Sequence, residues 1–181
     1  MNQPRREQAG MYAPRGWLSK QGITQLLQPY LTYPHDTQLD FAKSLPTPFR
    51  DYEPFGGISG KTAQELLNKL PAKNLTDRQN NAPLCAELLT LASENHQEIE
   101  LFGYAIGAQR FDERISIEGF IYYPQIPHLT ERFIKPGAEE SLFEEIANRL
   151  GIKSYLAPPD ELHYLRPYWN PGRSGWWAWW D

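Results

Sequence analysis

The stretch Ile99–Tyr123 decides the fold of this chain; with Pro124 it reads IELFGYAIGAQRFDERISIEGFIYYP. Branched and aromatic residues fill both of its arms, residues 99–108 and 114–123, and favour β-strands. The polar residues 109–113 between the arms are few enough for the turn of an antiparallel hairpin. The first arm carries apolar side chains on both of its faces, so we expect these strands to lie centrally in a sheet.

A second hairpin is predicted near the end of the chain, over residues 163–180. Residues 170–175, Asn-Pro-Gly-Arg-Ser-Gly, are turn formers that separate two aromatic arms. Pro167 cannot donate a backbone hydrogen bond, so we expect its arm at the edge of the sheet. We also expect Trp177 and Trp179 to share one face of an edge strand, opposite Trp176 and Trp180.

Three segments show the apolar spacing of helices: residues 63–70, 83–95 and 138–150. A further short helix is expected to begin at Ser19 as its N-cap. The elements do not alternate as strand–helix–strand, which argues against a parallel sheet. The sequence therefore predicts an α+β fold, in which an antiparallel sheet of two hairpins packs against three or four short helices.

The N-terminal part of the chain is organised differently. Residues 1–16 are polar and are predicted to form a flexible arm, and residues 17–181 a single domain. Prolines and aromatic rings alternate over residues 32–57, so we expect an extended segment that wraps its own domain or lies along a partner.

Composition narrows the class of protein. The chain has 181 residues, and its 18 Lys+Arg against 22 Asp+Glu give a net charge of -4, which argues against a general nucleic-acid binder. Its 1 Cys, Cys85, excludes a disulfide framework and is expected to fill the core. No run approaches the ~18–20 apolar residues of a membrane span, and residues 1–10 lack the apolar stretch of a signal peptide. We expect a soluble, cytoplasmic protein that engages no membrane.

Two features of the sequence resemble chemical sites. Residues 56–62, Gly-Gly-Ile-Ser-Gly-Lys-Thr, come close to a phosphate-binding loop, but Phe55 stands where that pattern needs glycine and residues 51–54 do not resemble a buried strand leading in. Thr62 with Glu65 instead fits a capping box that opens a helix. The sequence has four histidines: His35, His96, His128 and His163. They lie far apart and show no catalytic or metal-binding spacing, so we predict no catalytic residues, no metal and no cofactor.

Aromatic and arginine side chains, which anchor many protein–protein interfaces, gather near the C-terminus. The candidate partner-binding residues are Tyr168, Trp169, Arg173, Trp176, Trp177, Trp179 and Trp180. The sequence thus favours a non-catalytic protein, an adaptor, inhibitor or assembly factor that binds another protein; whether that partner is a second copy of the chain stays open. Two alternatives also stay open: a small enzyme using His163, Asp160 or His128 as acid–base groups, and a module that stacks sugars or bases on the tryptophans. The same rings would equally serve to complete the core.

Overall fold

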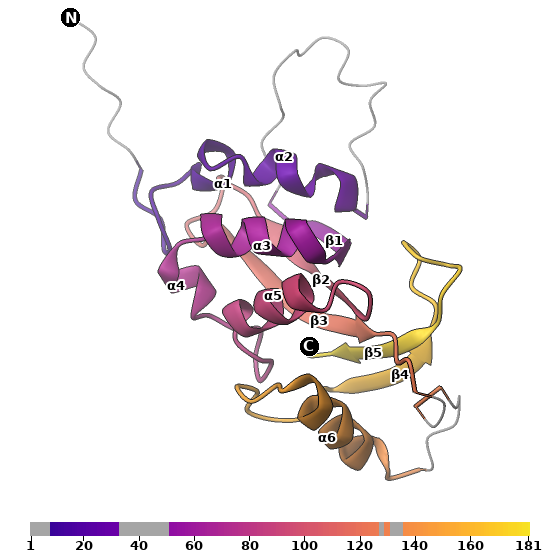
Figure 1. Ribbon diagram of the computed structural model, residues 1–181. Coiled ribbons are helices and arrows are strands. Elements are labelled where there is room, and N and C mark those ends of the chain that lie inside the picture. The colour runs from indigo at the N-terminus through magenta and orange to yellow at the C-terminus, as the bar shows by residue number, and fades with distance from the viewer. Residues whose placement is uncertain (1–7, 33–50, 127–128, 131–135) are drawn as a thin grey trace, which may run out of the picture.

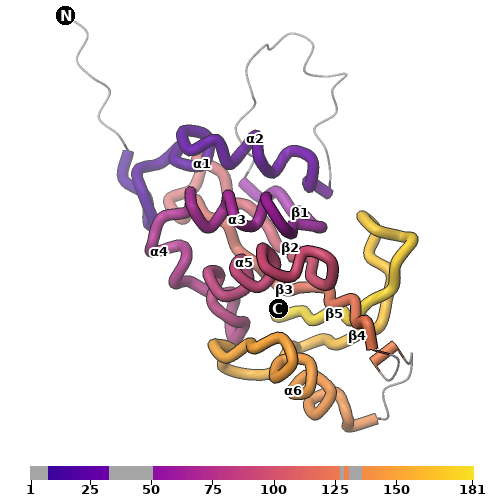
Figure 2. Tube along the Cα trace, in the orientation of Figure 1, coloured from indigo at the N-terminus to yellow at the C-terminus, as the bar shows by residue number. Residues whose placement is uncertain are grey.

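The computed structural model describes residues 8–32, 51–126, 129–130 and 136–181 (Figure 1, Figure 2). The strands, in their order across one antiparallel sheet, are β1 (Glu53–Ile58), β2 (Ile99–Ile106), β3 (Arg114–Tyr122), β5 (Gly175–Trp179) and β4 (Glu161–Leu165). The helices are α1 (Trp17–Lys20), α2 (Ile23–Leu27), the 3-10 helix η1 (Gln28–Tyr30), α3 (Gly60–Lys69), α4 (Ala72–Leu75), α5 (Cys85–Glu94) and α6 (Glu139–Leu150). The predicted α+β fold with an antiparallel sheet is confirmed.

The longer helices cover one face of the sheet, called here the inner face. Figure 1 shows α3 and α5 in front of the central strands, with α6 beside the β4–β5 end. Helix α5 contacts β2 and β3, and the Phe143 ring of α6 lies 5.5 Å from the Trp180 ring, centroid to centroid. The strand residues that join this core are buried because they alternate towards the helices, among them Leu101, Ala105, Ile117, Phe120, Trp176 and Ala178. The other face is called the outer face.

Both predicted hairpins are present. Strand β2 pairs with β3, and β4 pairs with β5. Tyr122 at the end of β3 pairs with Trp176, which places β5 between β3 and β4. The prediction that Trp177 and Trp179 lie on an edge strand is therefore wrong: β5 is internal, and β4 is the edge on this side.

The sequence pattern does not predict strand β1, which covers the end of the extended segment expected over residues 32–57 and one residue beyond it. Pro54 and the pair Gly56-Gly57 lower its strand propensity. Strand β1 is at the end of the sheet and forms a strand ladder on one side only, with β2. A proline is tolerated in such an edge strand, because its missing N–H can lie on the side that has no strand partner. A single bridge joins Leu31 to Phe55 on the other side. Residues 33–50 lie outside the described residues, so the choice between wrapping the domain and lying along a partner stays a prediction.

Two predicted helix starts are wrong. Helix α3 begins at Gly60 with Ser59 as N-cap, so Thr62 and Glu65 form no capping box; the Thr62 hydroxyl instead bonds the Tyr30 hydroxyl at 2.8 Å. The helix expected from Ser19 is two short helices, because Gly22 adopts a positive φ of 72° between them.

Residues 8–16, the described part of the predicted N-terminal arm, are held against the domain. The Met11 N–H donates to the Phe111 carbonyl at 2.8 Å, and the Arg15 Nε donates to the Ala108 carbonyl at 2.7 Å. The Tyr12 hydroxyl donates to the Asp77 carboxylate. This part of the chain is thus fixed to the turn between β2 and β3 and to the segment between α4 and α5.

Candidate functional site: the outer face of the sheet

Strand β5 divides the C-terminal tryptophans into two sets. Trp176 and Trp180 point to the inner face, where they are 2% and 0% exposed. Their indole N–H groups donate to the carbonyls of Leu129 at 2.6 Å and Ala157 at 3.0 Å. These two predicted partner-binding residues therefore belong to the core, and a partner surface has to be sought among the other five.

An aromatic cluster occupies the outer face, formed by Phe102 of β2, Trp177 of β5 and Trp169 of the β4–β5 loop. The Trp177 ring stacks on Phe102 with centroids 3.7 Å apart and planes 15° apart. The Trp169 ring lies 6.0 Å from each of the other two. Trp169, Trp177 and the neighbouring Trp179 are half-buried, so each leaves part of its ring accessible.

The Trp169 ring also packs against β1, at Gly56 and Gly57. A Cβ built on Gly56 would lie 2.3 Å from the Trp169 ring, which only a glycine avoids. Next in the chain to Trp169, Tyr168 is 57% exposed, and its ring meets the Trp169 ring edge-on with centroids 4.8 Å apart. The loop of residues 166–174 thus lies over the outer face and presents its rings there.

The Glu100 carboxylate holds this loop. It accepts hydrogen bonds from the Trp169 indole at 2.6 Å, the Asn170 amide at 3.1 Å and the Tyr123 hydroxyl at 2.7 Å. Burial, and then the adjacent Glu100 carboxylate, raise the pKa of Tyr123 above its ordinary value. The Arg173 guanidinium lies 4.1 Å from the centroid of the Tyr123 ring, a cation–π contact that adds a second attachment for the loop.

The sequence did not single out Glu100, Phe102 or Tyr123 as members of this site. The sequence does contain one indication of their position. They alternate with the core side chains of the same hairpin, which places them on the opposite face of the sheet. The local sequence does not predict that a loop more than forty residues further along the chain packs on these side chains.

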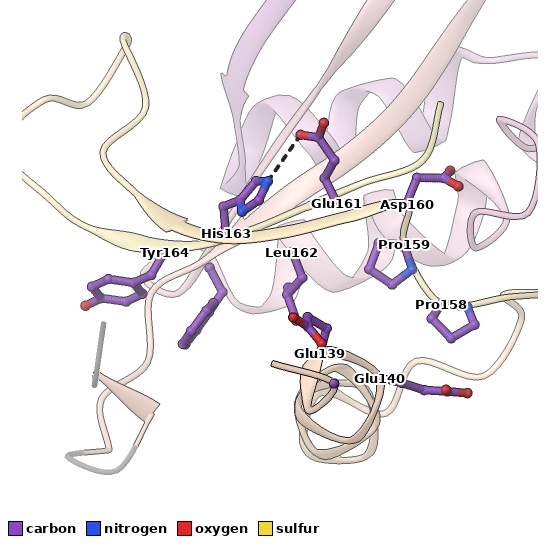
Figure 3. Close-up of a pocket in the computed structure, with 11 residues that line it drawn as sticks. Glu139, Glu140, Pro158, Pro159, Asp160, Glu161, Leu162, His163 and Tyr164 are labelled. Carbon is purple, nitrogen blue, oxygen red and sulfur yellow. Dashed lines mark ion pairs between the residues drawn. The ribbon is translucent and has the colours of Figure 1, made fainter. Parts of the chain in front are cut away.

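The candidate acid–base groups do not converge. His163 and Glu161 are both exposed, and their side chains lie 3.6 Å apart. The Asp160 carboxylate instead accepts the Asp181 backbone N–H at 2.9 Å. In Figure 3 Glu161 and His163 extend to one side of β4 while Leu162 points to the other, towards α6. His128 lies outside the described residues, and within them no group of three His, Cys, Asp or Glu side chains is arranged to hold a metal ion.

The near-match to a phosphate loop takes a different form from the one expected. A strand, β1, does lead into α3, contrary to the expectation for residues 51–54. Only Ser59 separates Ile58 from Gly60, however, so no loop is present to surround a phosphate group. The Lys61 ammonium points to solvent near Glu65, at 3.8 Å.

No protein-family model matches the chain, nor does any curated protein or any solved structure. None of the helices in the described ranges has the length and apolar composition needed to cross a bilayer.

Proposed function

We propose that this chain is a non-catalytic protein, an adaptor, inhibitor or assembly factor, that binds another protein through its outer face. The observation that supports the proposal is the accessible aromatic surface of Trp169, Trp177 and Trp179, bordered by Tyr168 and Arg173. Tryptophan, tyrosine and arginine are the side chains that most often dominate binding energy at protein interfaces. Covering a further ~50 Å² on each of three rings contributes roughly 3–4 kcal/mol before ordering costs.

The attachment of the loop to Glu100 and Tyr123 favours binding over chemistry. A surface that is already ordered loses little conformational entropy on association. Two of the charged groups beside the cluster, Glu100 and Arg173, are used in holding the loop in place. A cytoplasmic location is part of the proposal, because a chain with 1 Cys uses no disulfide framework; microscopy of the tagged full chain checks it.

The test is capture of a partner from an extract of the source cells, with the tagged full chain as bait. The variant Tyr168→Ala, Arg173→Ala, Trp179→Ala removes accessible groups, and with Arg173 one attachment of the loop, while keeping the Phe102–Trp177 stack and the Glu100 hydrogen bonds. It is expected to lose at least about tenfold in captured partner. The matched control carries Phe111→Ala and Leu156→Ala, which remove exposed side chains elsewhere.

Equal capture by the triple variant contradicts the proposal. So does a thermal shift with a sugar or nucleotide that the triple variant abolishes, because that result favours the ligand-stacking alternative. Truncation after Gly175 is not a usable test, since it removes the core side chains Trp176 and Trp180 together with the outer ones.

A further inference from the structure

A second surface lies on the opposite side of β4 from the outer face. A cavity of about 910 Å³ runs between β4 and the start of α6 (Figure 3). Its apolar lining comes from Leu162 and Tyr164 of β4 and from Trp176 of β5, and four acidic residues are also among those that line it: Glu139, Glu140, Asp160 and Glu161. The Glu161 side chain turns to the opposite side of β4 (Figure 3). No lysine or arginine is among the eleven described residues that line it.

The register of the sheet shows which backbone groups of β4 point away from β5. The Trp180 N–H donates to the Glu118 carbonyl of β3 at 2.9 Å. Backbone donors and acceptors alternate between the two sides of a strand, so Trp177 and Trp179 direct theirs towards β4. Their partners in β4 are His163 and Glu161. The N–H and C=O groups of Leu162 and Tyr164 therefore point away from β5, at an edge where no strand of the described residues pairs with β4.

We propose that β4 binds an extended basic peptide segment of a partner protein, which adds a sixth strand at this edge. The outward backbone groups of Leu162 and Tyr164 supply the strand hydrogen bonds, and the groove beside them receives the peptide's side chains. Alternate side chains of an added strand point to opposite faces, so basic residues meet Glu139 and Glu140 on one face and Glu161 on the other. Lysine and arginine also suit the groove, because their aliphatic stems cover apolar surface while their charges stay at the rim.

The charges and the length of the edge disfavour a second copy of this chain as the occupant. Pairing β4 with β4 of another copy brings the carboxylates of both rims together, and like charges across a strand pair are destabilising. Pro158 and Pro159 before β4 and Pro167 after it leave only a short window of free edge. A short peptide fits that window, whereas a stable dimer needs a longer one.

The probe is the peptide acetyl-Lys-Arg-Val-Thr-Val-Arg-Lys-amide, labelled for fluorescence anisotropy and mixed with the full chain. Binding is expected to weaken roughly three- to tenfold in the variant Glu139→Gln, Glu140→Gln, and to stay unchanged in the control Glu65→Gln, Glu94→Gln, which removes the same charge elsewhere. A peptide of the same sequence with alternate N-methyl groups keeps the charge but cannot complete the strand ladder. It is expected to bind at least about tenfold more weakly.

Hydrogen exchange gives a residue-level readout. In the free chain the amides of Leu162 and Tyr164 should exchange quickly and that of His163 slowly, and the peptide should slow the first two. The proposal is overturned by absence of peptide binding, by equal binding of the N-methylated peptide, by unchanged exchange at Leu162 and Tyr164, or by a dimer that buries β4. None of these outcomes alters the expected effect of the outer-face triple variant, so this site and the proposed function are tested separately.

Discussion

The substitution Glu100→Gln tests whether one carboxylate holds the β4–β5 loop on the outer face. In the native chain one carboxylate oxygen, Oε2, accepts from both the Trp169 indole and the Tyr123 hydroxyl, and the other, Oε1, accepts from Asn170. Glutamine keeps one acceptor, loses the charge, and turns an NH₂ group towards one of these donors. Hydrogen bonds to a charged group contribute about 1.5–3 kcal/mol each and neutral ones about 1 kcal/mol. Since Glu100 is half-buried, we expect a net loss of about 1–3 kcal/mol.

Urea denaturation followed by circular dichroism measures this loss. A decrease of the midpoint at unchanged slope is expected, because the surface exposed on unfolding stays the same. In a chain of this length 1 kcal/mol corresponds to about 2–4 °C in melting temperature. Glu94→Gln, which neutralises an exposed carboxylate, serves as control and should change stability by less than about 0.5 kcal/mol. A Glu100→Gln variant as stable as this control, with unaltered tryptophan emission, refutes the idea that the carboxylate anchors the loop.

Three further substitutions or reactions probe the same structure. Gly56→Ala places a Cβ against the Trp169 ring and should lower the free energy of unfolding, measured with urea, by about 1–3 kcal/mol. Gly172 has open space around it, so Gly172→Ala should be nearly neutral. Equal effects of the two substitutions contradict the packing described. Burial raises the pKa of Cys85 to about 12, so a thiol reagent at pH 8 should label it only as fast as the chain unfolds, and rapid labelling of the folded chain contradicts its burial. Burial, and then the Asp181 carboxylate, raise the pKa of Glu118. An acid whose pKa is raised by folding destabilises the folded chain once it ionises, so Glu118→Gln should raise the melting temperature at pH 7. Below about pH 4 the carboxyl is protonated in both the folded and the unfolded chain, and the gain should vanish. A gain that persists in acid excludes ionisation as its cause.

Local pattern was sufficient for the central architecture. Two runs of branched and aromatic residues around a polar turn can bury both faces only inside a sheet, and this fixed β2 and β3 to within a residue or two. Helix α6 followed equally well from acidic residues at its start and Gly151, at a φ of 73°, after its end. In both cases the interactions that define the element are close in sequence.

The errors arise where distant segments decide. Strand β1 contains a proline and two glycines that a strand pattern disfavours, yet Gly56 is needed there because Trp169 lies on it. Alternation correctly separated Trp176 and Trp180 from Trp177 and Trp179. It did not show which set is buried, since that depends on where α6 packs. Nor did a hairpin pattern reveal that β5, rather than β4, pairs with β3.

The two proposed surfaces, the outer face and the edge of β4, are adjacent, so one partner could contact both. A peptide added beside β4 extends the sheet by one strand, so half of its side chains join the row of His163 and Trp177 on the outer face. A partner whose folded part covers the aromatic cluster therefore reaches the free edge with a short tail. The second contact then forms at a high effective concentration, which strengthens binding without a large interface at either surface. In that arrangement the outer-face triple variant and the Glu139→Gln, Glu140→Gln variant act on one complex. Their combined effect on affinity should then exceed the sum of the two, because each single variant still holds the partner by the other contact and the combined variant holds it by neither.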